Sequence, residues 1–183
     1  QFTDGHQAQY DYVIGADGIH SIVRQYVLAS QQQQAVQPRF SGTWAYRGII
    51  KNQAFKQAIQ QLGNDAEIAD VPQMFLGKNK HILTFPIRQG EDINIVAFKS
   101  NRADVYLPEH TEWTRPVSQQ QMLDDFADWS DSCQALLALI EQPTIWDLYA
   151  MEEELSYEIQ SGREIFMGDA AHAMMSSRGA GAG

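Results

Sequence analysis

The sequence predicts a mixed α/β protein whose two ends differ from its middle. Near the N-terminus, a short apolar strand at 10–14 runs into Gly15, an acidic residue and the start of a helix. Near the C-terminus, a second apolar strand at 165–167 runs into Gly168 and an acidic residue in the same way. Between them, residues 39–100 carry β-rich runs separated by turn residues, a pattern typical of an antiparallel sheet.

Length and composition are those of a globular protein without a membrane span. The chain has 183 residues, of which 44% are apolar and 20% charged, enough for one or two small domains. No apolar run approaches the roughly 18 residues that a transmembrane helix requires. The single cysteine, Cys133, excludes an internal disulfide and is compatible with a reducing cytoplasm, where we expect the protein to act.

Charge and histidine distribution argue against several classes of ligand. A formal net charge of −10 opposes binding to nucleic acid or to an anionic membrane surface. The five histidines are scattered and have no set of cysteine partners, so we predict no metal site.

The first 38 residues are expected to supply a hairpin strand, a buried strand and a helix. Asp4 and Gly5 predict a hairpin turn whose second strand runs to Tyr10 and whose partner precedes residue 1. A helix with one apolar face is predicted after the buried strand. Its apolar residues are Ile19, Ile22, Val23, Tyr26 and Val27. The glutamine run at 31–34 is interpreted as a loop.

The middle of the chain predicts a strand, a helix and an antiparallel meander. Residues 44–50 are β-rich, and apolar residues at helical spacing follow from Ala54 to Leu62, where Gly63 ends the helix. Further strands are then separated by short turns. They are expected at 73–76, 81–87 and 93–99.

Two helices and a strand close this middle section. Ser118 with Gln121 forms a capping box for the first helix. The second helix carries an apolar stripe that begins at Cys133 and stops before Pro143, so we interpret Cys133 as a core residue rather than a nucleophile. A strand is expected at 145–150.

The C-terminal segment combines a strand, a sharp turn, a carboxylate and a glycine-rich run. Gly168 lets the backbone turn, and Asp169 is expected to cap the segment that follows. Because a carboxylate has only acceptors at neutral pH, Asp169 can hold two hydroxyls of a ribose or ribityl chain. The run at 179–183 offers bare backbone N–H groups to an anion or a flavin edge. The alternative is a strand exit with an aspartate cap and a flexible tail.

Together, the two strand–glycine–acid segments resemble the paired fingerprints of the flavin-dependent aromatic hydroxylases, the group A flavoprotein monooxygenases with the p-hydroxybenzoate hydroxylase fold. Residues 15–18 (Gly-Ala-Asp-Gly), with Ser21 and Arg24, are similar to the Asp-Gly motif of that family. Residues 168–172 (Gly-Asp-Ala-Ala-His) are similar to its Gly-Asp motif. The alternating glycines at 179–183 most resemble the salicylate hydroxylase-like branch.

The resemblance implies part of a Rossmann-like FAD-binding domain with an inserted antiparallel-sheet substrate domain. Residues 1–38 and 144–183 would belong to the FAD-binding domain, and residues 39–143 to the substrate domain. The family's first βαβ unit carries Gly-x-Gly-x-x-Gly, which holds the FAD pyrophosphate. No such pattern follows a strand here, so we interpret the chain as an internal segment of a longer enzyme.

The resemblance also implies a reaction. NAD(P)H would reduce FAD, O2 would add to give a C4a-hydroperoxide, and its distal oxygen would attack a small aromatic substrate such as salicylate or a hydroxybenzoate. The flavin supplies this chemistry, while the protein positions the substrate and excludes water. Two alternatives stay open: a flavoprotein of the same fold that oxidises or epoxidises a non-phenolic substrate, and a truncated, non-catalytic binding module.

Matching to the Gly-Asp motif and the glycine run assigns one set of cofactor-binding residues. Gly168 and Asp169 would meet the ribityl or ribose hydroxyls of FAD. Gly179, Ala180 and Gly181 would lie against the flavin.

Matching to the Asp-Gly motif assigns a second set. Asp17, Gly18 and Arg24 would be tied to both FAD and NAD(P)H. Asp17 as a helix cap and Arg24 as a structural ion-pair partner are the alternatives. Both cofactors are anions, so their phosphates need local cations, for which Arg24, Arg47 and Arg178 are candidates.

The substrate is expected against the antiparallel sheet. Arg47 would reach the flavin or a substrate carboxylate, or else is a strand-edge charge. His81 and Phe85 occupy alternate positions of one strand and so face the same way. The family often has Tyr at the position of Phe85, and it usually has Pro where Ser176 stands. His172 is a catalytic candidate within the Gly-Asp motif, with loop packing as the alternative.

Overall fold

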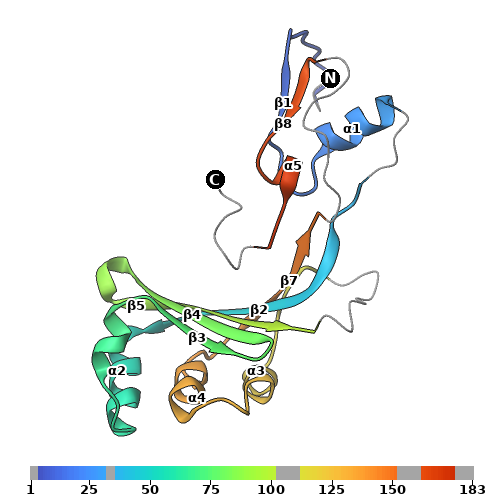
Figure 1. Cartoon of the computed structure of the whole chain (residues 1–183). Coiled ribbons are helices and arrows are strands. Elements are labelled where there is room, and N and C mark those ends of the chain that lie inside the picture. Colours follow the sequence, from blue (N-terminus) through green and yellow to red (C-terminus); the bar gives the residue numbers. More distant parts are fainter. Residues whose placement is uncertain (1–3, 32–35, 102–111, 152–161, 176–183) are drawn as a thin grey trace. The chain divides into compact units, whose positions relative to one another are not determined.

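The computed structural model of the protein describes residues 4–31, 36–101, 112–151 and 162–175. The chain forms two compact units, Gln1–Ser41 with Tyr149–Gly183, and Gly42–Leu148 (Figure 1). The first contains a parallel strand pair and the second an antiparallel sheet, which confirms the mixed α/β class.

The first unit is organised around two short parallel strands. β1 (Val13–Gly15) pairs with β8 (Glu164–Phe166). Each strand leads into a helix, α1 (Ile22–Ser30) after β1 and α5 (Asp169–His172) after β8 (Figure 1). The small core between them consists of Val27, Phe166 and Ala171. The two motif segments therefore lie next to each other.

Two expectations for this unit are wrong. Residues 6–10 form no strand, because a strand needs a hydrogen-bonded neighbour and none lies beside them in the described part of the chain. On α1, Ile22 and Tyr26 are 75% and 71% exposed. The buried stripe instead comprises Arg24, Val27 and Leu28, so a charged residue occupies a position that hydrophobic periodicity assigns to the outside.

The second unit is built on a six-stranded sheet with the order β3-β4-β5-β2-β7-β6. The strands are β2 (Arg39–Lys51), β3 (Gln73–Gly77), β4 (Lys80–Ile87), β5 (Asp92–Ser100), β6 (Thr114–Pro116) and β7 (Thr144–Ala150). The meander β3-β4-β5 is antiparallel, as predicted, and β5 also pairs antiparallel with β2. A short 3₁₀ segment, η2 (Arg88–Gly90), connects β4 to β5.

One face of this sheet is covered by helices. Figure 1 shows α2 (Asn52–Gln61), α3 (Gln119–Asp125) and α4 (Asp131–Ala138) on the same side of the sheet, and η1 (Ala66–Asp70) follows α2. The core on this side includes Tyr46, Phe55, Ile82, Ile95, Met122 and Leu136. Gly48 permits the close approach of the segment that follows α4, since a Cβ there would lie 2.3 Å from the Ile140 side chain.

The predicted helix ends and stripe of this unit are confirmed. The Ser118 hydroxyl accepts a hydrogen bond from the Gln121 N–H at 3.2 Å, and Gly63 follows α2 with a φ of +74°. Cys133 is buried in the core, and burial raises the pKa of its thiol. A buried, protonated thiol suits the core role that the sequence indicates.

Candidate functional site

In the first unit, Asp17 accepts hydrogen bonds at the N-terminus of α1, whose N-cap residue is Ser21. Its carboxylate accepts hydrogen bonds from the Ser21 hydroxyl at 2.5 Å and from the N–H groups of Ile22 and Val23 at 2.7 and 3.1 Å. Partial burial opposes the charged form, but the bonds from Ser21 and from the backbone outweigh it and hold the pKa of Asp17 below its usual value. Gly18 follows with a φ of +79°. A cofactor contact of Asp17 and Gly18 stays a prediction.

Arg24 joins the two motifs. Its side chain is completely buried. Nη1 donates to the Ala170 carbonyl oxygen at 2.8 Å, and Nη2 donates to the Ile19 carbonyl oxygen at 2.5 Å. Burial lowers the pKa of Arg24, an effect that the nearby Asp17 charge partly offsets. The guanidinium thus holds the loop after β1 against the helix after β8, and its phosphate contact stays a prediction.

Gly15 brings these segments into close contact. A Cβ at this position would lie 2.9 Å from Val23 Cγ1 and 3.1 Å from Phe166 Cδ1, closer than side chains tolerate. The Met167 N–H donates to the Gly15 carbonyl oxygen at 3.0 Å, which extends the contact between β1 and β8. Glycine at 15 is therefore a packing requirement of this unit.

The carboxylate of the Gly-Asp motif is exposed and accepts no hydrogen bond from the described residues. Gly168, with a φ of +57°, occupies the N-cap position, and Asp169 is the first residue of α5 and makes no capping bond. The expectation that Asp169 caps the helix is therefore wrong, because the glycine already stands at that position. Asp169 is exposed, and no group of the described residues donates a hydrogen bond to its carboxylate. His172 is half-buried in the same helix.

Several predicted residues lie outside the described part of the chain. They are Ser176, Arg178, Gly179, Ala180 and Gly181. Their roles stay predictions.

In the second unit, Arg47, His81 and Phe85 share the sheet face opposite the helices, which we call the open face. Strand alternation sets the face, since Tyr46 packs on the helix side and Arg47 follows it. In the register of the sheet, Arg47 lies opposite Val96, and Val96 lies opposite Leu83. His81 and Phe85 flank Leu83 two residues away on either side, so three of the four predicted substrate residues surround the half-buried Leu83 and the buried Val96.

Arg47 is positioned by an aromatic ring. Its guanidinium carbon lies 4.3 Å from the centroid of the Trp146 ring, within cation–π range. Its Nε is buried and has no hydrogen-bond partner among the residues that the structure describes, and burial lowers the pKa of the guanidinium. Sequence reasoning missed Trp146, which belongs to a strand far along the chain.

His81 and Phe85 differ in what surrounds them. The His81 ring stacks on Phe98 with centroids 4.3 Å apart and an interplanar angle of 12°. Burial lowers the pKa of His81, so the neutral imidazole predominates at neutral pH. Phe85 is 40% exposed and presents an apolar ring to the open face.

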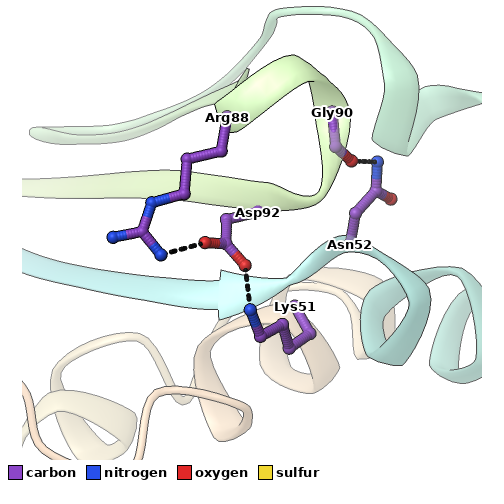
Figure 2. Close-up of polar contacts among 5 residues, drawn as sticks. All are labelled: Lys51, Asn52, Arg88, Gly90 and Asp92. Carbon is purple, nitrogen blue, oxygen red and sulfur yellow. Dashed lines mark hydrogen bonds and ion pairs between the residues drawn. The ribbon is translucent and has the colours of Figure 1, made fainter.

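A charged cluster that the sequence did not indicate lies at one end of the β4–β5 hairpin. Figure 2 shows Lys51 and Arg88 converging on the 2%-exposed Asp92, at 2.7 and 2.9 Å. The hydrogen bond from Lys51 is the main reason that the pKa of Asp92 is lowered. Asn52 donates to the Gly90 carbonyl oxygen at 2.8 Å and so fastens the turn to α2. The charged side chains of this cluster thus pair with one another.

Two hollows of this unit lie away from the predicted substrate residues. A groove of about 510 Å³ follows the end of β2, between Ile49 and Leu139. A smaller hollow of about 270 Å³ lies on the helix side, where the Tyr46 hydroxyl and the Lys99 amine both donate to Asp125 at 2.5 Å. Burial, followed by the Asp125 bond, raises the pKa of Tyr46. Neither hollow is lined by Arg47, His81 or Phe85.

No metal cluster and no membrane-spanning helix were found among the described residues. No group of three or more His, Cys, Asp or Glu side chains in that part of the chain is placed to hold a metal ion. None of its helices is long and apolar enough to cross a bilayer.

The family model described as FAD binding domain matches residues 3–182. The chain belongs to this family. FAD-binding domains need acceptors for the hydroxyls of the cofactor, and the exposed Asp169 carboxylate, with no donor from the described residues, fits that need.

Within this family, the chain is similar to several individual proteins. A salicylate hydroxylase of Pseudomonas putida is 47% identical over 100% of this chain and 42% of that protein. A 6-methylsalicylate 1-monooxygenase of Aspergillus terreus is 37% identical over 100% of this chain and 38% of that protein. The solved structure of a salicylate hydroxylase substrate complex matches with a TM-score of 0.92 and 40% identity, over 99% of this chain and 44% of that chain. The chain thus spans about two fifths of these relatives.

Proposed function

We propose that the whole protein is an FAD-dependent, NAD(P)H-using monooxygenase that acts with O2 on a small aromatic acid of the salicylate type. The observation that carries the proposal is the 47% identity over the full chain to a salicylate hydroxylase, combined with an open sheet face that bears Arg47. A cytoplasmic location agrees with the single buried cysteine.

Asp169 is the residue of the first unit that we assign to FAD. Its carboxylate is exposed and would accept hydrogen bonds from ribityl or ribose hydroxyls, which are charge-assisted and hence strong. Asp17 and Arg24 support FAD binding indirectly. Asp17 accepts hydrogen bonds from the backbone of the Asp-Gly segment, and Arg24 donates to the backbone of both motif segments. When bound, FAD supplies the redox chemistry that activates O2.

The open face of the second unit is assigned to the substrate. The ring would lie over Leu83 and Val96, and Arg47 would bind its carboxylate. By sheet geometry, the Cα atoms of Arg47 and of either His81 or Phe85 are about 12 Å apart, so one aromatic acid fits among their side chains. A neutral His81 can accept a hydrogen bond from, or hold the proton of, a phenolic hydroxyl.

The test uses the full-length enzyme. Purified protein should carry a flavin absorbance spectrum, and its oxidation of NADH or NADPH should accelerate several-fold on addition of salicylate. Labelled O2 should transfer one oxygen atom to the aromatic product. A flavoprotein whose NAD(P)H oxidation ignores salicylate and hydroxybenzoates, but responds to a non-phenolic substrate, would favour the alternative reaction class of this fold.

A further inference from the structure

The Arg47–Trp146 pair contains a residue that the proposed function does not yet use. Trp146 belongs to β7 and is 37% exposed, and its indole N–H donates to the Thr144 hydroxyl at 3.2 Å. That bond and the strand backbone restrict how the ring can rotate. Arg47 therefore contacts an indole ring whose orientation is restricted by the sheet.

Arg47 is unusual among the partly buried cations of the second unit. Each of the four other partly buried Lys and Arg side chains in the described part of this unit pairs with a carboxylate. The pairs are Lys56–Asp70, Lys80–Asp128, Lys99–Asp125 and Arg115–Asp147. Within the described residues of the unit, no carboxylate pairs with Arg47, and its side chain contacts the ring instead.

An aromatic partner has a different consequence from a carboxylate partner. A carboxylate would occupy the N–H donors of the guanidinium and neutralise its charge. A ring attracts the cation through its face and leaves the donors at the edge unoccupied. With the Trp146 ring as its partner, the Arg47 guanidinium therefore keeps its N–H donors free of the described carboxylates and available for a planar, two-oxygen acceptor.

We propose that Trp146 is a positioning residue, which holds the Arg47 guanidinium flat so that its edge binds the carboxylate of an aromatic acid substrate. The inference rests on the proposed function and adds to it a source of selectivity for carboxylates over neutral phenols. Trp146 acts through Arg47 and need not touch the reacting atoms.

The test measures binding of two ligands of the same shape to the full-length, FAD-loaded enzyme. Salicylate carries the carboxylate, and salicylamide replaces it with a neutral amide. Dissociation constants are read from the perturbation of flavin absorbance for wild type, Trp146→Leu, Trp146→Phe, Arg47→Met and the double variant Trp146→Leu/Arg47→Met. Unfolding midpoints on the same samples show that each variant is folded.

We expect Trp146→Leu to weaken salicylate about tenfold and salicylamide less than twofold, with Trp146→Phe in between because it keeps a ring. The double variant should bind salicylate no more weakly than Arg47→Met alone, because Trp146 acts only through Arg47. An equal loss of affinity for both ligands, or additive losses in the double variant, would overturn the inference.

If salicylate binds and turns over normally in all variants, the inference fails while the proposed function stands. If wild type binds neither ligand, the proposed function itself fails.

Discussion

Arg24 in the first unit and Arg47 in the second have different kinds of partner, although burial lowers the pKa of both guanidinium groups. Arg24 donates to the carbonyl oxygens of Ala170 and Ile19, so its charge maintains the fold. Arg47 lies against the Trp146 ring and has no carboxylate partner in the described part of the chain. The Nε groups of both residues are buried and have no hydrogen-bond partner among the described residues. The two arginines therefore differ in their Nη groups, which have backbone acceptors in Arg24 and no described acceptor in Arg47.

The same distinction holds for the two motif aspartates. Asp17 accepts three hydrogen bonds from the residues around it, whereas Asp169 accepts none from the described residues. The carboxylate of the Asp-Gly segment thus maintains backbone geometry, whereas the carboxylate of the Gly-Asp segment has acceptors that no described residue uses. Four predictions sharpen this comparison.

Arg24→Met should have the largest effect. It removes two charge-assisted hydrogen bonds and leaves the buried Ala170 carbonyl and the part-buried Ile19 carbonyl without this donor, which should lower the free energy of unfolding by about 3–5 kcal/mol. Denaturant unfolding of the full-length enzyme measures this loss. The matched control, Lys78→Met, removes an exposed charge without an ion pair among the described residues and should cost less than about 0.5 kcal/mol. Equal stability of the two variants would refute the structural role of Arg24.

Asp169→Ala should leave a folded protein that retains little FAD. Loss of bonds to two hydroxyls removes about 2–4 kcal/mol of binding, or roughly one to three decades in affinity. Flavin titration of the apoenzyme measures it. Asp131 is the first residue of α4, as Asp169 is of α5, so Asp131→Ala is the control and should bind FAD normally. Unchanged flavin affinity in Asp169→Ala would reject the assignment.

Phe85→Tyr and Arg47→Ala should change selectivity more than stability, because both side chains lie on the open face. We expect Phe85→Tyr to move the ratio of kcat/KM between hydroxybenzoates, and Arg47→Ala to move the ratio between salicylate and a neutral phenol. Each ratio should change about fivefold to tenfold, near 1–1.4 kcal/mol. Unfolding midpoints should stay close to wild type. Wild-type turnover and selectivity in both variants would place the substrate away from this sheet.

Asp17→Ala should have the smallest effect, about 1 kcal/mol for a lost helix cap. The folded-state pKa of Asp17 lies below its ordinary value of 3.8. Its charged form therefore stabilises the fold above that ordinary value, and the contribution is lost as pH falls through the folded pKa. The stability difference between wild type and variant should shrink from about pH 7 to about pH 2. A difference that does not change with pH would show that the charge of Asp17 is irrelevant.

The sequence predicts well those features that depend on neighbours along the chain. Alternation placed His81 and Phe85 on one face, and helical spacing identified the stripe that begins at Cys133, because both periodicities are local. The buried Arg24 escaped prediction, since its acceptor on Ala170 lies 146 residues away in sequence. The contact of Trp146 with Arg47 escaped prediction for the same reason, and so did the pairing of Lys51 with Asp92, which lies 41 residues away in sequence. The motifs identified the family, but they could not show which polar side chains form hydrogen bonds within the protein and which have none.

The contrast between the two arginines can be tested in one measurement, with Lys substitutions that keep the charge. Unfolding midpoint and salicylate affinity are measured on the same FAD-loaded samples of Arg24→Lys and Arg47→Lys. Arg24→Lys should unfold earlier, because one amine cannot reach both carbonyls, while its folded fraction binds salicylate within about twofold of wild type. Arg47→Lys should keep its midpoint and lose about tenfold in salicylate affinity, because a point charge replaces the planar fork. An Arg47→Lys variant that unfolds early yet binds salicylate normally would contradict the account.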